Sequence, residues 1–77
     1  MTISPTNRCR RDANGIARTL EINALGAHGP THYGPVKVKR IRERYVWTIN
    51  GNRSAKADCI NWIERDLEIS SRAALTA

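Results

Sequence analysis

Four residues of the chain carry the side chains of a structural zinc site. Cys9 and Cys59 supply two thiols, and His28 and His32 supply two imidazoles, which together make a Cys₂His₂ set. Zinc ligands usually come in close pairs, whereas each cysteine stands alone in this sequence. We therefore predict no metal site and no cofactor, with both histidines in a loop and Cys59 in the core, where a free cysteine behaves as a small hydrophobe.

The same cysteines bear on redox and nucleophilic chemistry. A Cys9–Cys59 disulfide is possible by number, but a reducing compartment disfavours it, and two cysteines cannot form a scaffold of several bridges. A Cys–His nucleophile could be drawn from Cys59 and either histidine, yet Cys59 falls in an apolar stripe, away from a cleft. Gly26, Gly29 and Gly34 do not form a phosphate-binding fingerprint. The sequence predicts a protein that is not an enzyme.

The most informative pattern is the uneven distribution of charge. The 77 residues include 13 Lys and Arg and 7 Asp and Glu, for a net charge of +6. Residues 36–53 hold six of these cations against the single acid Glu43, whereas acids outnumber cations in residues 54–77. A surface that meets a polyanion shows such segregation, although basic residues also protect exposed sheet edges. The candidate binding residues are Lys37, Lys39, Arg40, Arg42, Arg44 and Arg53.

These cations fall on two segments that alternate like β-strands. Residues 44–49 alternate with period two, and the Asn50-Gly51 pair that follows tolerates the positive φ of a tight turn. Residues 36–39 alternate as well, but Ile41 falls in the opposite phase, which predicts a bulge or the start of a turn near residues 42–44. Together the segments predict a hairpin with an outer face crowded with Lys and Arg.

A helix is predicted over residues 54–72. Apolar residues recur there at spacings of three and four, and Ser54 can serve as the N-cap. The stripe consists of Cys59, Ile60, Trp62, Ile63 and Leu67. Before the hairpin, residues 26–35 contain three glycines and two prolines and predict a loop.

The first quarter of the chain allows two interpretations. Residues 12–15 are typical of a turn and residues 18–24 alternate like a strand, whereas Ile16, Leu20 and Ala24 also fit one face of a helix. The threonine and the Asn-Gly pair favour the strand.

The predicted fold class is therefore α+β, a small three-stranded antiparallel sheet backed by one C-terminal helix. Residues 1–77 make a single small domain, and we expect residues 1–15 and 73–77 to be partly flexible.

The predicted hairpin combines cations with aromatic side chains. The arginines of residues 40–44 lie beside Tyr45 and Trp47, which suits phosphate contact together with stacking or wedge contact. A two-stranded ribbon also fits the width of the DNA major groove. Trp47 has a second interpretation, which we favour: it packs on the helix through Trp62, because so small a domain needs its large side chains inside.

Residues 45–62 resemble the last strand and helix of the ethylene-response-factor type DNA-binding domain, and the arm-binding domains of phage-type integrases look similar. Val46-Trp47 stands where the family has a strand aromatic, Ser54-Ala55 at the helix start and Trp62 at a helix aromatic. The Gly-Thr-Phe element of the family is absent, with residues 50–53 in its place. The resemblance implies a three-stranded sheet, backed by a helix, that reads DNA with Arg and Trp side chains of its exposed face.

The small size and idiosyncratic sequence also resemble those of phage or mobile-element accessory proteins, including anti-CRISPR-type inhibitors, because we expect the whole protein to be this one domain. Two hypotheses follow. In the first, an accessory protein binds the DNA or RNA backbone through the basic hairpin. In the alternative, a protein-binding inhibitor or adaptor docks the same face on a host protein with an acidic surface.

The remaining expectation concerns location. The sequence has no apolar run of about 18 residues and no apolar region of a secretory signal near its N-terminus. We therefore expect a cytoplasmic protein with no membrane partner.

Overall fold

A computed structural model describes residues 5–26 and 28–76 of the chain. The four strands form one antiparallel sheet in the order β1-β2-β3-β4. The elements are α1 (Pro5–Ala24), β1 (His32–Tyr33), β2 (Val36–Ile41), β3 (Arg44–Ile49), β4 (Asn52–Ser54) and α2 (Lys56–Thr76). The α+β class is confirmed, but the sheet has a fourth strand and the fold a second helix.

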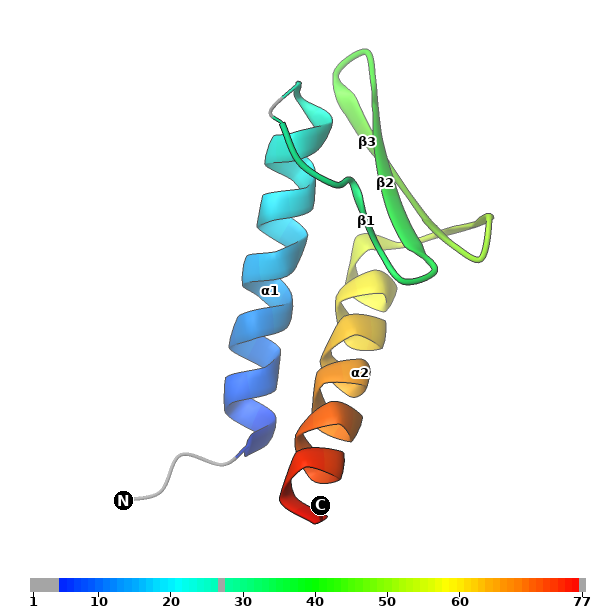
Figure 1. Cartoon of the computed structure of the whole chain (residues 1–77). Helices are drawn as coiled ribbons and strands as arrows, with labels where there is room; N and C mark the ends of the chain where they lie inside the picture. The colour runs from blue at the N-terminus through cyan, green and yellow to red at the C-terminus, as the bar shows by residue number, and fades with distance from the viewer. Residues whose placement is uncertain (1–4, 27, 77) are drawn as a thin grey trace.

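The two helices lie side by side and run antiparallel, and the sheet packs beside one end of the pair (Figure 1). Ion pairs join the helices near both ends of the contact. Arg10 Nη1 lies 3.6 Å from Glu64 Oε2, and Lys56 Nζ lies 3.1 Å from Glu21 Oε1. The hairpin turn between β2 and β3 stands at one end of the molecule, and the start of α1 and the end of α2 lie together at the other.

Helix α1 replaces the turn predicted over residues 12–15 and the strand predicted over residues 18–24, so both predictions were wrong. Ala13, Ala17 and Leu20 are buried on one face of this helix, and burial of this face outweighs the poor helix propensity of its polar residues and glycine. The threonine that favoured a strand serves the helix, since Thr19 Oγ1 donates to the Gly15 carbonyl at 3.0 Å.

The core lies between the helix pair and the inner face of the sheet. Val36, Val38 and Trp47 point inward from β2 and β3, and Cys59 and Ile63 meet them from α2. Only 4% of Trp47 is exposed, which confirms its interpretation as a core residue. Trp47, the largest side chain of the hairpin, therefore packs in the core and is not exposed on the outer face.

The apolar stripe predicted for α2 is confirmed, but the helix begins two residues later than predicted. Ser54 is not the N-cap, because it belongs to β4 and its Oγ donates to a backbone carbonyl two residues earlier, at 3.1 Å. The first helical hydrogen bond runs instead from the Cys59 N–H to the Ala55 carbonyl, at 3.1 Å. The chain therefore passes from β4 into α2 through a single residue.

Most of the residues in the chain ends belong to helices. Residues 5–15 lie in α1 and residues 73–76 in α2, whereas residues 1–4 and 77 lie outside the described residues, and the flexibility of the ends stays a prediction. The loop predicted over residues 26–35 contains the short strand β1. Among the described residues, neither helix is long and apolar enough to cross a membrane.

The middle of α1 generates the first prediction. Gly15 is exposed, and the position that a β-carbon would occupy has open space around it. We expect Gly15→Ala to raise the free energy of unfolding by about 0.5–1 kcal/mol, because glycine costs that much relative to alanine inside a helix. Thermal unfolding followed by circular dichroism measures the change, as a Tm about 4–8 °C higher per kcal/mol for a domain of this size.

Gly51→Ala is the matched control. The space at Gly51 is equally open, but its φ of +81° is one that alanine adopts with strain, so its Tm should fall. A Gly15→Ala protein with a lowered Tm would contradict the helix over residues 5–24.

Candidate functional site

The register of the sheet assigns each basic residue to one of its faces. Residues that are directly opposite in an antiparallel pair share a face. Lys37 is opposite Thr48, and Thr48 is opposite Arg53 on the next strand. His32 of β1 is opposite Lys37 and extends this row to all four strands. Lys39 and Arg44 lie on the same outer face, which faces away from the helices. Four of the six candidate residues are therefore exposed on one open surface.

Arg40 has a different environment from the other candidates. It is opposite Tyr45 on the inner face of the sheet, and its guanidinium carbon lies 4.8 Å from the centroid of the Tyr45 ring. Its Nε donates to the Arg42 carbonyl at 2.8 Å. This side chain therefore braces the end of the hairpin, with a cation–π contact on one side and the turn on the other.

Arg42 lies in the turn of the hairpin, together with Glu43. Arg42 has a φ of +56°, a left-handed conformation that only a few per cent of non-glycine residues adopt. Its carbonyl accepts the hydrogen bond from Arg40 Nε, and this bond helps to hold the backbone of Arg42 in the left-handed conformation. Arg42 is exposed in this turn.

The turn of the hairpin begins directly after Ile41, and no bulge interrupts the pairing of β2 with β3. The pairing of β2 with β3 is continuous from Val36 opposite Ile49 to Ile41 opposite Arg44. Ile41 is the last residue of β2, and its register places it on the outer face, where it is 53% exposed. Of the two alternatives that the sequence allowed, the turn is confirmed and the bulge is absent from this pair.

The outer face is hollowed next to the turn. The apolar side chains in the lining come from Ile41 and Val46, and the cationic ones from Arg42, Arg44 and Arg53. Glu43, Thr48 and Gly51 complete the lining. The surface thus combines a small apolar area with guanidinium groups on β3, β4 and the turn.

The outer half of the hairpin is a two-stranded ribbon. Strand β1 pairs only with Val36 and Lys37 of β2, and β4 pairs only with residues 47–49 of β3. Residues 39–46 therefore have no third strand beside them among the described residues. Three residues on each side of the turn extend for about 10 Å at about 3.4 Å per residue. Figure 1 shows this turn beyond the end of the sheet at which β1 and β4 pair.

Tyr33 holds β1 against α2. Its hydroxyl donates to Asp66 Oδ2 at 2.7 Å, and its ring meets the ring of Trp62 edge-on, with centroids 6.3 Å apart. The hydrogen bond to Asp66, with burial and the negative charge of Asp66, raises the pKa of Tyr33 to about 12. This contact fixes the edge strand on which His32 lies beside Lys37. Nothing in the sequence pattern indicated it, because Tyr33 stands in a predicted loop.

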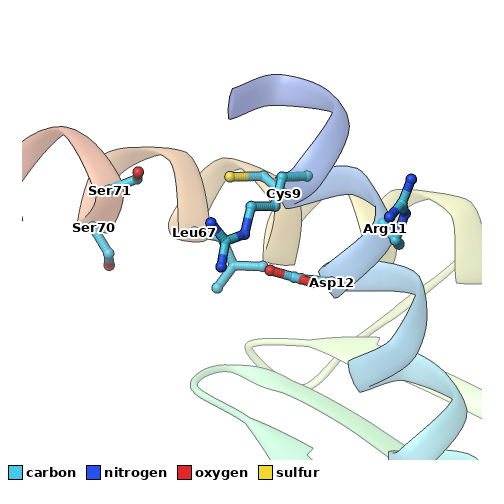
Figure 2. A pocket seen from close by; sticks show the side chains of 7 residues that line it. Cys9, Arg11, Asp12, Leu67, Ser70 and Ser71 are labelled. Carbon is cyan, nitrogen blue, oxygen red and sulfur yellow. The ribbon is translucent and has the colours of Figure 1, made fainter. Parts of the chain in front are cut away.

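A second cavity lies between the two helices, away from the sheet, and contains Cys9 (Figure 2). Its other lining residues are Arg8, Arg11, Asp12, Leu67, Ser70 and Ser71, and no histidine lines it. Burial and the nearby carboxylates, that of Glu68 first among them, raise the pKa of the Cys9 thiol. The thiol is therefore held in its neutral form, which is a poor nucleophile.

The two cysteines do not form the disulfide that their number allowed. Both cysteines are free and buried, and burial raises the pKa of Cys59 as well.

The four residues considered for zinc are dispersed. His28 is in the exposed loop after α1, and His32 is on the outer face of the sheet. Within residues 5–26 and 28–76, no three or more His, Cys, Asp or Glu side chains come together in a way that could hold a metal ion. The absence of a metal or other cofactor stays a prediction.

The chain matches no family model, no curated protein and no solved structure in comparisons with each. Its function is therefore argued from its own residues, and the resemblance of residues 45–62 stays an expectation.

The Tyr33–Asp66 contact generates the second prediction. The pKa of Tyr33 is about 12 in the folded protein, above the ordinary value of 10.0. The neutral hydroxyl is thus favoured by folding, so its contribution to stability is complete below pH 10 and is lost as the pH rises from 10 to 12. We expect Tyr33→Phe to lower the free energy of unfolding at pH 7 by about 1–3 kcal/mol, as for other hydrogen bonds to charged groups.

Urea titrations at several pH values measure both effects. The difference in stability between the parent and Tyr33→Phe should be constant from pH 7 to 9 and should shrink above pH 10. A difference that stayed constant up to pH 12 would contradict the assigned hydrogen bond. Tyr45→Phe is the control, because no hydrogen bond of the Tyr45 hydroxyl is found among the described residues.

Proposed function

We propose that the protein binds the phosphate backbone of nucleic acid with the outer face of its sheet and the β2–β3 ribbon. The observation that carries this proposal is the set of exposed cations on one open sheet face. None of these cations forms an ion pair with another described residue, whereas Arg10 and Lys56 on the helices do. The set consists of Lys37, Lys39, Arg44 and Arg53, with Arg42 in the adjacent turn.

These cations differ from scattered surface charges in that they share one sheet face. Like charges on one surface repel, and in a domain this small such repulsion is a cost to folding. An anionic ligand removes that repulsion when it binds. Phosphate groups repeat along a nucleic acid, so cations on β2, β3 and β4 of one face can contact several of them together.

The shape of the ribbon supports the same proposal. A major groove of B-form DNA is about 12 Å wide and about 8.5 Å deep, and it admits a two-stranded ribbon. The unflanked segment of the hairpin extends for about 10 Å, so it can enter a groove while the wider region of the sheet stays at the phosphates. Lys39 and Arg44 on its outer face and Arg42 in its turn supply charge along this length.

A protein partner is the second candidate function, and the hollow beside the turn favours it. Ile41 and Val46 give this hollow an apolar area, with arginines around it. Arginine and apolar side chains are enriched at the centres of protein interfaces. An acidic protein surface would then occupy the same face as a nucleic acid, and the inhibitor or adaptor hypothesis would hold.

A salt series tests the proposal. Each contacted phosphate contributes about 0.9 to the slope of log K against log salt, so four contacts weaken binding by at least about a hundredfold between 50 and 200 mM salt. We expect Lys39→Ala combined with Arg44→Ala to reduce the slope by about two and to leave the Tm nearly unchanged, because exposed charges contribute little to stability. Fluorescence anisotropy with labelled duplex and single-stranded oligonucleotides measures the slopes.

Arg18→Ala combined with Arg65→Ala is the matched control. These arginines are exposed on α1 and α2, so the variant loses the same net charge without changing the sheet. Its slope should equal that of the parent protein. If the parent protein binds neither duplex nor single-stranded oligonucleotides at low salt, the proposal is wrong, and the same variants should be tested for binding to acidic proteins.

A further inference from the structure

We propose that Ile41 inserts between neighbouring base pairs of duplex DNA and kinks the duplex. This inference rests on the proposed function and names the residue that sets the mode of binding. Ile41 ends strand β2 on the outer face of the ribbon and is 53% exposed. The other exposed large aliphatic side chains among the described residues, Ile22, Leu25 and Ile69, lie on or beside the helices.

The environment of Ile41 points to a nucleic acid rather than to a hydrophobic contact within the chain. Its cross-strand partner is Arg44, and Arg42 follows it in the turn. Ile41 thus lies between two exposed arginines. When these arginines bind phosphates of a duplex, they bring its aliphatic side chain toward the bases. Proteins that kink DNA insert aliphatic side chains such as isoleucine between base steps, while basic residues hold the backbone on either side.

The reach of the ribbon fits this role. The minor groove of B-form DNA is about 7.5 Å deep and the major groove about 8.5 Å, and the unflanked ribbon extends for about 10 Å. A side chain at the last strand position can therefore meet the edges of the base pairs. Tyr45 and Trp47, the aromatic residues beside these arginines, are not placed for this contact, because one lies under Arg40 and the other is in the core.

The turn is also held in place before binding. Arg40 packs over Tyr45 and donates to the Arg42 carbonyl, which fixes the backbone just beyond Ile41. Ile41 must separate two stacked base pairs when it inserts. Because the turn beside it is already ordered, little conformational entropy is lost on insertion. The energy for unstacking, a few kcal/mol per step, comes from the phosphate contacts that a bent duplex adds.

The test compares Ile41→Thr with the parent protein on a duplex labelled at both ends for fluorescence energy transfer. Threonine keeps the β-branched side chain and so keeps the strand propensity, but it is smaller and polar. The parent protein should bend the duplex by at least about 20°. Ile41→Thr should bind with an unchanged salt slope and leave the duplex straight. Ile69→Thr, the same substitution at a residue 58% exposed on α2, should bend the duplex like the parent protein.

A second measurement uses a duplex with one mismatched pair, in which unstacking costs less. The parent protein should bind it about tenfold more tightly than the matched duplex, equivalent to about 1.4 kcal/mol, and Ile41→Thr should bind both equally. If the parent protein binds without bending, or Ile41→Thr bends equally, the role of Ile41 is refuted while the proposed function stands. If the parent protein binds no nucleic acid, both are refuted.

Discussion

Ala13 and Ala17 on α1 and Cys59 on α2 are small and buried, and they allow the two helices to pack closely along their length. The rest of the structure depends on this contact. Neither helix has a wide enough apolar face to be stable alone, and the sheet has only one apolar face. Once the helices are paired, Ile63 and Leu20 form a surface on which Val36, Val38 and Trp47 can be buried.

The size of the chain determines what remains exposed. A domain of this length buries only about 60% of the surface of its unfolded chain, and among the described residues one core cluster contains every buried apolar side chain except Cys9. No layer of the described structure covers the outer face of the sheet. That face carries Lys37, Lys39, Arg44 and Arg53 beside Ile41 and Val46, so its strands hold charge of one sign. The open basic face is thus a consequence of a sheet that the helices cover on one side.

The sequence correctly predicted the elements whose local residue pattern favours the same structure as their packing in the fold. The helix stripe around Ile63 and the Asn50-Gly51 turn depend on spacing and on φ preference, both of which are local. Helix α1 was the less favoured of two interpretations, because Asn14-Gly15 and Thr19 resemble a turn and a strand, and contact with α2 outweighs them. Four candidate site residues share a face as alternation requires, and the same alternation places Arg40 on the inner face, where it packs over Tyr45.

The described ends of the chain meet at the pole opposite the ribbon. Helix α1 begins and α2 ends at one extremity of a molecule whose longest dimension is 43 Å, and the β2–β3 turn lies at the other (Figure 1). A tether joined near either end would therefore point away from the basic face and could not readily fold back over it. Attachment to a bead, a surface or a fused domain leaves the whole outer face of the sheet accessible, and two copies joined through their ends would present their ribbons in opposite directions.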